Sequence, residues 1–184
     1  MKKILAIAAM ALLTLTASAQ KLGRVNFTEL YQLAPEADAA REQITAMQNE
    51  AEETFNTMVE EYNSKASQYQ QKSSTWTAAI KEAKEKELVD IQNRVQQFQQ
   101  SFSQELQQKQ AELMNPIMEK AQKAVQDLAK AQGIVAVFDE SSALYFDPTA
   151  VVDLTPAARK AMGIKDGRTL EQLAQELQAA AQVQ

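Results

Sequence analysis

The sequence contains no cysteine and no histidine among its 184 residues. Disulfides, thiol nucleophiles, imidazole bases and the usual zinc ligands are therefore excluded. It also has no Gly-x-x-x-x-Gly-Lys loop that would hold the phosphates of a nucleotide. The carboxylates, lysines, tyrosines and serines that remain form no nucleophile-and-base spacing. We therefore expect no enzymatic activity, no cofactor and no bound metal.

Glycine is also scarce, because only four are present and none lies between Gly23 and Gly133. The chain between them is rich in Ala, Gln, Glu, Lys and Leu, a composition typical of long helices. Only Pro35, Pro116 and the polar cluster 73–75 interrupt it. Aromatic residues make up 6% of the sequence, which is too few for a compact core and favours an extended protein.

Positive charge is in the minority, with 19 basic residues against 24 acidic ones and a net charge of −5. Residues 1–19 carry two lysines and no acid, so their removal would lower the net charge by two, to −7. A chain this acidic does not suit a phosphate backbone, and we expect no nucleic acid partner.

The first nineteen residues have the organisation of an export signal. Two lysines precede an apolar run over 4–15, and Ala-Ser-Ala at 17–19 offers a small-residue cleavage site. An uncleaved anchor helix would need a longer apolar run of about 20 residues. We predict a signal peptide over 1–19 and an exported mature chain that begins at Gln20.

Two narrow apolar stripes at helical spacing follow. The return stripe runs from Leu88 to Leu128, and the outgoing one has spacings of 3, 4, 4, 3, 4, 4 and 3. Helices that fold back near 73–77 would bring together residues whose numbers sum to about 150, which places Pro35 level with Pro116. We predict an antiparallel helical hairpin over 36–131, with arms about 55 to 60 Å long. The outgoing stripe comprises Ile44, Met47, Ala51, Phe55, Met58, Tyr62, Ala66 and Tyr69.

Strand signals lie on both sides of this helical region, over 22–27, 134–138, 143–146 and 151–152. Thr28 and Thr155 are placed to cap short helices, and glycines at 133 and 163 to end helices. The predicted fold is α+β and mostly α, with a small β body built from 20–35 and 132–163 and the hairpin inserted between them. Candidates for the body core and for contacts between subunits are Val25, Phe27, Ile134, Val135, Val137, Phe138, Leu144 and Phe146.

The segment 164–184 forms a C-terminal extension. Thr169 and Gln172 have the spacing of a capping box, and leucines at 170, 173 and 177 form a helical stripe. A short helix is predicted, without a functional interpretation.

Several short strings occur in the order and spacing that resemble the Skp/OmpH family over about residues 20–163. They are Lys-Leu-Gly-Arg-Val-Asn-Phe at 21–27, Leu-Met-Asn-Pro-Ile at 113–117, the segment 133–139 and Val-Asp-Leu-Thr at 152–155, around a Gln-rich hairpin. The resemblance implies a periplasmic, jellyfish-like homotrimer with a β body on the threefold axis and three arms around a cavity. It also implies an ATP-independent holdase chaperone that keeps unfolded outer-membrane β-barrel proteins from aggregating.

On the arm, the candidates for client contact are Phe55, Met58, Tyr62, Tyr69 and Trp76. The first four lie on the stripe, so packing between the helices is the favoured interpretation, whereas Trp76 either contacts client or caps the end of the seam. Members of the family are typically basic, but glutamates interleave with the tip lysines here, which argues against lipopolysaccharide or membrane contact. The alternative function is a coiled-coil structural or adaptor protein of the cell envelope.

Overall fold

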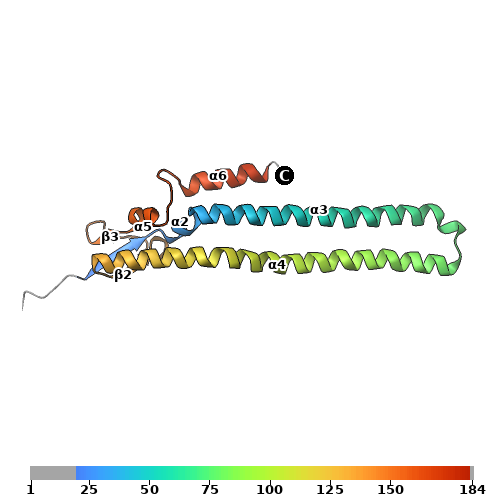
Figure 1. The fold of residues 1–184 in the computed structure, drawn as a ribbon, viewed down its shortest axis with the longest axis horizontal. Coiled ribbons are helices and arrows are strands. Elements are labelled where there is room, and N and C mark those ends of the chain that lie inside the picture. Colours follow the sequence, from blue (N-terminus) through green and yellow to red (C-terminus); the bar gives the residue numbers. More distant parts are fainter. Residues whose placement is uncertain (1–19, 183–184) are drawn as a thin grey trace, which may run out of the picture. The chain divides into compact units, whose positions relative to one another are not determined.

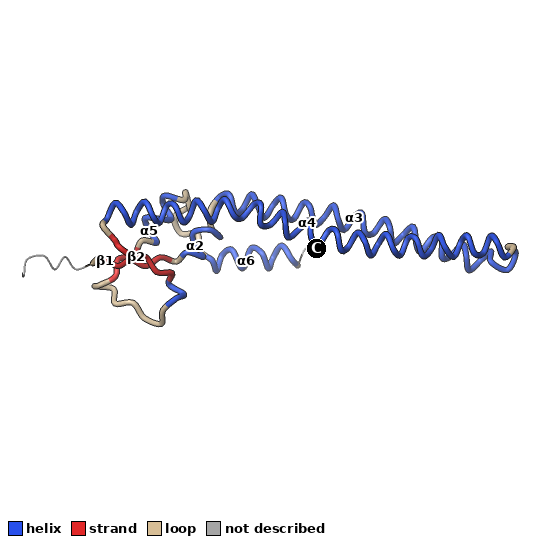
Figure 2. Tube along the Cα trace, turned by 90° about the horizontal axis from the view of Figure 1, so that it is seen from below, coloured by secondary structure: helices blue, strands red, loops and turns tan. Residues whose placement is uncertain are grey.

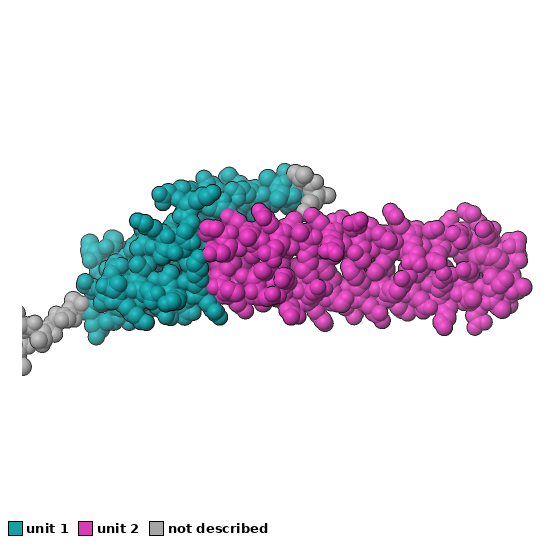
Figure 3. Space-filling view, viewed as in Figure 1, with its two compact units in different colours: residues 1–34, 118–184 teal, residues 35–117 magenta. Residues whose placement is uncertain are grey.

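A computed structural model describes residues 20–182 of the chain. The predicted signal peptide, 1–19, lies outside the described residues. The chain divides into two compact units (Figure 3), unit 1 with Met1–Ala34 and Met118–Gln184, and unit 2 with Pro35–Ile117.

Unit 2 consists of α3 (Pro35–Lys72), the 3-10 turn η1 (Ser73–Thr75) and α4 (Ala78–Gln132) as far as Ile117. Proline occupies the first position of α3, where no N–H is needed, and two acidic residues follow in its first turn, where the helix dipole favours negative charge. At the start of α4, the backbone N–H of Ile80 donates to Thr77 Oγ1 over 3.4 Å. The polar residues 73–77 therefore separate α3 from α4. The polar cluster at 73–75 had predicted an interruption of the helical region at this place.

Within unit 2, α3 and α4 lie side by side in both views (Figures 1 and 2). Gln92 Nε2 donates to Tyr62 Oη over 3.0 Å, and Arg94 Nη2 lies 2.9 Å from Glu61 Oε2. These partners lie four and five positions further along α4 than a fold-back sum of about 150 predicts. The shift follows from the turn, because the helices are connected by 73–77 and the fold-back is centred beyond Thr75. Hydrogen bonds between α3 and α4 also join Lys65 to Glu87 and Tyr69 to Glu85.

The predicted stripes form the contact between these helices, here called the α3–α4 seam. Ile91 is 1% exposed and Ala51 is 8% exposed, while the other stripe residues of unit 2 are half-buried, apart from the buried Ile117, and polar neighbours are mostly exposed. A narrow stripe buries little area per residue, because each helix has only one neighbour in this unit. The seam therefore holds few side chains that are completely enclosed.

Unit 1 contains a sheet with the strand order β2-β1-β3, where β1 is Lys21–Val25, β2 is Ile134–Asp139 and β3 is Val151–Asp153. Both neighbours pair with β1 in parallel. The register of β1 with β2 steps from Ile134 to Ala136, so Val135 is the extra residue of a bulge. Both β2 and β3 keep one edge that no described strand of this chain covers.

The expectation of a strand over 143–146 is wrong for the single chain, in which these residues form a loop. Each side of β1 is already occupied, and 143–146 pairs with neither outer strand. A strand forms only where another strand satisfies its backbone groups, so composition alone could not decide the outcome.

The core of unit 1 collects residues from both ends of the chain. Gly23 lies at its centre, where an added Cβ would be 3.3 Å from methyl groups of Ile134 and Val137. A side chain at this position of β1 would therefore displace side chains of the neighbouring strand β2. The core members are Val25, Leu30, Leu33, Ala34, Ala121, Val125, Ala129, Ile134, Leu154, Ala158, Met162, Ile164 and Leu173.

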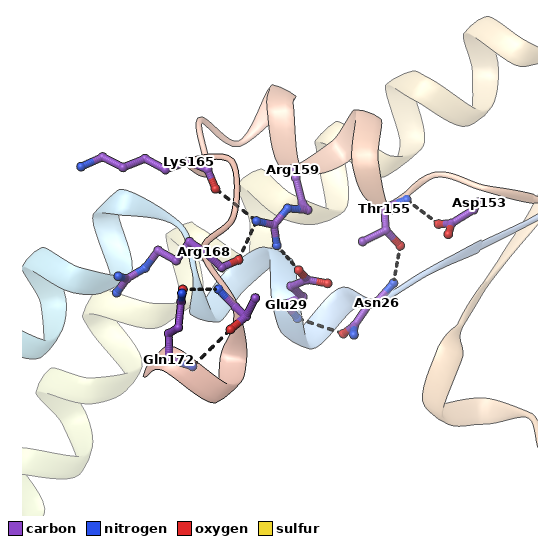
Figure 4. Close-up of polar contacts among 9 residues, drawn as sticks. Asn26, Glu29, Asp153, Thr155, Arg159, Lys165, Arg168 and Gln172 are labelled. Atoms are coloured by element: carbon purple, nitrogen blue, oxygen red, sulfur yellow. Dashed lines mark hydrogen bonds and ion pairs between the residues drawn. The ribbon is translucent and has the colours of Figure 1, made fainter. Parts of the chain in front are cut away.

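Two predicted helix caps differ from those observed. Asn26, not Thr28, caps α2 (Phe27–Gln32), accepting a hydrogen bond from the Glu29 N–H over 3.0 Å. Thr155 is the first residue of α5 (Thr155–Ala161), and its hydroxyl oxygen accepts from the Asn26 N–H over 3.0 Å instead (Figure 4). Asp153 Oδ1 accepts from the Thr155 N–H over 2.8 Å. Both predictions were wrong because several residues that can cap a helix lie within three positions of the first residue of α2 and of α5.

The C-terminal extension forms α6 (Leu170–Ala181) and has the predicted capping box. Thr169 Oγ1 accepts from the Gln172 N–H over 3.2 Å, and Gln172 Oε1 accepts from the Thr169 N–H over 3.1 Å (Figure 4). On the predicted leucine stripe Leu173 is buried, whereas Leu177 is 49% exposed. Only the first half of the helix therefore contributes to the core.

Candidate functional surfaces

The five arm residues predicted to contact client lie in or beside the α3–α4 seam, and all are half-buried. The Tyr69 hydroxyl donates to Glu85, and this hydrogen bond raises the pKa of Tyr69 above its usual 10.0. The Trp76 ring meets the Tyr69 ring edge to face, with centroids 5.7 Å apart. These contacts favour packing of the seam as the main role of the aromatic residues, and their contact with client remains a prediction.

Mixed charges surround the turn between α3 and α4. Lys65 and Lys84 donate hydrogen bonds to the Glu87 carboxylate and lower its pKa from 4.5 to about 2. Within the described part of the chain, Lys72, Lys81 and Lys86 have no ion-pair partner. The turn therefore offers a few separate cations between glutamates and no continuous basic surface.

Recesses run along the flanks of the seam. Two of them, of about 650 and 190 Å³, share Met47, Glu50 and Glu105 as lining residues, and we call this continuous feature the mid-arm groove. A third recess, of about 220 Å³, lies between Tyr62 and Ile91. The grooves arise because the stripe is narrow, which leaves apolar atoms of α3 and α4 open to solvent beside the contact.

In unit 1, apolar side chains are exposed on β2 and on the loop that follows it. Val135 is 61% exposed and Phe138 is 43% exposed, and Leu144 and Tyr145 are fully or largely exposed at 109% and 76%. Of the other core candidates, Val25 and Ile134 are buried, and Phe27, Val137 and Phe146 are half-buried. The single chain thus encloses two of the eight candidates and leaves three open.

A groove of about 530 Å³ lies beside this exposed apolar surface, between β2 and the last turns of α4. Val125, Ala129 and Ile134 are apolar parts of its wall, and Lys130 and Asp139 are charged parts. It could hold an apolar side chain or a short segment of another chain.

Among residues 20–182, no group of three His, Cys, Asp or Glu side chains is placed to bind a metal ion. Of the helices that the structure describes, none is long and apolar enough to cross a membrane.

The sequence pattern of the family described as outer membrane protein (OmpH-like) matches residues 21–162. The chain belongs to the OmpH-like family. The match includes all three strands and both long helices, so the OmpH-like region accounts for β1 through α5, and α6 follows it.

The OmpH-like fold is also found in a crystal structure from Caulobacter crescentus CB15 of a protein described as a candidate OmpH-like outer membrane chaperone. The TM-score is 0.69, and the similarity covers 79% of this chain and 85% of that one. Because the sequences are only 13% identical, this likeness shows a shared fold. No curated protein matches the chain in sequence.

Sequence patterns had located the seam of this OmpH-like protein but not the mid-arm groove. Glu50 and Glu105 line it together, yet they lie 55 positions apart and neither belongs to a stripe. The fold-back register is the signal that could have paired them, and the expected register was several positions too low.

Proposed function

We propose that this OmpH-like protein is an ATP-independent holdase chaperone that binds unfolded outer-membrane β-barrel proteins in the periplasm and prevents their aggregation. Family membership over residues 21–162 is the observation that carries the proposal. The structural neighbour from Caulobacter crescentus, which is named as a candidate outer membrane chaperone, supports it. The family match gives no support to the alternative of an envelope adaptor.

In this proposal α3 and α4 form an antiparallel hairpin arm that carries the client-binding surface. The seam supports this role because its apolar atoms are half-buried and open to shallow grooves, so they offer many weak contacts and no deep pocket. Methionine and aromatic side chains at such surfaces adapt to different partners. Release would then follow from folding of the client and needs no nucleotide.

A homotrimer is proposed as the working form, held together by unit 1. The exposed apolar residues Val135, Phe138, Leu144 and Tyr145 support this assignment, because a small domain rarely leaves so many apolar side chains open. The open edges of β2 and β3 support it as well, since uncovered edges attract further strands. The segment 143–146, which has strand composition but no strand partner in this chain, could supply one.

The proposed division of roles can be tested by shortening the arm without changing its ends. Deleting residues 55–65 and 90–100 together removes two matched 11-residue segments, which face each other in the observed register and preserve the phase of the seam. Each helix would lose about 16 Å, while the turn and unit 1 stay intact. The shortened protein should keep the mass of a trimer in solution and retain denatured β-barrel protein less well.

The measurements are light scattering for mass and sedimentation of a urea-denatured outer-membrane barrel protein diluted into buffer with the chaperone. Full-length protein that leaves the barrel protein in the pellet would contradict the chaperone function. A monomeric full-length protein would contradict the trimer, and unchanged retention by the shortened protein would contradict the role of the arm. Periplasmic location is checked separately, by N-terminal sequencing of the protein released by osmotic shock, which should begin at Gln20.

A further inference from the structure

The mid-arm groove combines an apolar floor with an acidic rim. Phe98 and Phe102 stack on the floor, with ring centroids 6.1 Å apart and planes inclined by 11°. Met47 contributes to both recesses of the groove. All three side chains are half-buried, so they support the seam and still present apolar surface to a ligand.

Two glutamates form the rim, one on each helix. Glu50 of α3 and Glu105 of α4 both line the two recesses, and both residues are exposed. Neither side chain forms an ion pair with any residue that the structure describes. A third rim glutamate, Glu112, is paired over 3.4 Å with Lys109, which also lines the larger recess, so the two charges offset each other. The groove therefore keeps a net negative charge, from the two glutamates that form no ion pair with a described residue.

The surrounding sequence strengthens this negative potential. Residues 36–64 contain a single base, Arg41, against eight acids, which gives this stretch a net charge of −7. Like charges gathered along one helix raise the local concentration of cations and repel anionic chains. The acids are Glu36, Asp38, Glu42, Glu50, Glu52, Glu53, Glu60 and Glu61.

We infer that the mid-arm groove binds extended client segments in which an apolar or aromatic residue is flanked by lysine or arginine. The apolar residue would lie on Met47 and the phenylalanine pair, and the cations would pair with Glu50 and Glu105. A cation above Phe98 or Phe102 would add attraction from the ring face. This inference rests on the proposed chaperone function and assigns the client chemistry of one site within it.

Electrostatic complementarity decides which segments are favoured more than how tightly they bind. An acidic segment with the same apolar residues would meet like charge on both sides of the groove. Selection among the segments of one unfolded client would therefore follow charge, while the apolar floor supplies a contact common to all of them.

Binding of two labelled peptides, measured by fluorescence anisotropy with the mature protein, tests the inference. The peptides share their apolar residues and differ only in lysine against glutamate at the flanking positions. The variant Glu50→Gln with Glu105→Gln removes the two rim charges that form no ion pair, without changing side-chain size. The control, Glu52→Gln with Glu60→Gln, removes two exposed charges from α3 that line neither recess.

Wild-type protein should bind the lysine peptide more tightly than the glutamate peptide, and the difference should shrink at high salt. The rim variant should weaken binding of the lysine peptide roughly five-fold, and the control variant by less than about two-fold. Equal affinity of wild-type protein for both peptides would overturn the inference. An equal loss in the two variants would also overturn it, because the general charge of α3 would then act in place of the groove.

Retention of denatured barrel protein, measured on the same samples, separates this inference from the proposed function. Retention without any preference between the peptides contradicts the groove inference and leaves the chaperone function intact. Preference for the lysine peptide without retention of the barrel protein supports the groove and contradicts the proposed function.

Discussion

The ring of Trp76 meets the ring of Tyr69 edge to face, with centroids 5.7 Å apart and planes inclined by 69°. This contact joins the turn after α3 to the last turn of the helix itself. The tryptophan therefore closes the end of the seam, and we expect it to contribute to stability before it contributes to client binding.

Trp76→Ala should lower the free energy of unfolding by about 1 kcal/mol or somewhat more, because the ring contact and the buried ring surface are both lost. Urea unfolding followed by circular dichroism measures this change. Trp76→Phe keeps an aromatic edge near Tyr69 and should lose less. Full stability of the alanine variant, together with weaker retention of client, would instead assign Trp76 to client binding.

The burial of Ile91 predicts a larger loss. Ile91 is 1% exposed in the seam, so Ile91→Ala should cost about 2 to 5 kcal/mol through lost burial and the cavity left behind. Val89 on the same turn is 50% exposed, and Val89→Ala should stay within about 0.5 kcal/mol of wild type. Chemical denaturation of the two variants side by side is the measurement, and equal losses would mean that Ile91 is not enclosed in solution.

Glu87 makes the stability of the arm depend on acid. Its folded pKa is about 2 against the usual 4.5, so its ion pairs with Lys65 and Lys84 stabilise the fold fully above about pH 5. This stabilisation is lost as the pH falls through the range from about 5 to 2, because the unfolded chain takes up the proton first. The effect is small, since all three side chains are partly exposed.

An NMR titration of the Glu87 side-chain carbon should give a midpoint well below 4.5, and Lys65→Gln should move this midpoint upward. The melting temperature of Lys65→Gln should also depend less on pH between about 5 and 2 than that of the wild type. A midpoint near the usual value in wild-type protein would show that the carboxylate is solvated and unpaired.

Arg159 fastens the loop that leads into the C-terminal helix (Figure 4). Its guanidinium pairs with Glu29 and donates to the carbonyl oxygens of Arg168 over 2.7 Å and Lys165 over 3.2 Å. Arg159→Lys keeps the charge but loses the fork that reaches these acceptors, so the free energy of unfolding should fall by about 1 to 2 kcal/mol.

Hydrogen exchange of the backbone amides of residues 164–169 should accelerate in Arg159→Lys. Lys160→Met is the control, because this neighbouring side chain is exposed and should leave the loop unchanged. Unaltered exchange in the lysine variant would show that other contacts hold the loop.

Local patterns predicted most of the elements because their causes lie within a few residues. The glycine-free composition and the 3-4 spacing of apolar residues predicted a helical region over 36–131, and the outer ends of α3 and α4, Pro35 and Gln132, each lie within one residue of those bounds. Gly133 was expected to end a helix, and it follows α4 with a φ of +66°, a conformation that costs other residues about 1 to 2 kcal/mol. The capping box at Thr169 and Gln172 depends on a spacing of three residues, and this spacing predicted it correctly.

Contacts between distant residues were harder to predict. The register of α3 against α4 was misjudged by four to five positions at Tyr62 and Glu61, because the length of a turn is not fixed by its composition. The mid-arm groove depends on this register, so the sequence did not predict that Glu50 of α3 and Glu105 of α4 line it together. Among the caps, Asn26 and Asp153 supplied the acceptors expected from Thr28 and Thr155, a choice decided by backbone geometry.

Composition, periodicity and short motifs were therefore sufficient for the helices, the sheet-forming segments at both ends and the resemblance to a family, since each depends on a residue and its near neighbours. Tertiary structure alone decided that Val135 bulges out of β2, that 143–146 stays a loop, and that Glu50 lies across a groove from Glu105. The reason is physical: strand pairing and helix register are set by partners that lie far away in the chain, and a residue's sequence neighbours carry no record of them.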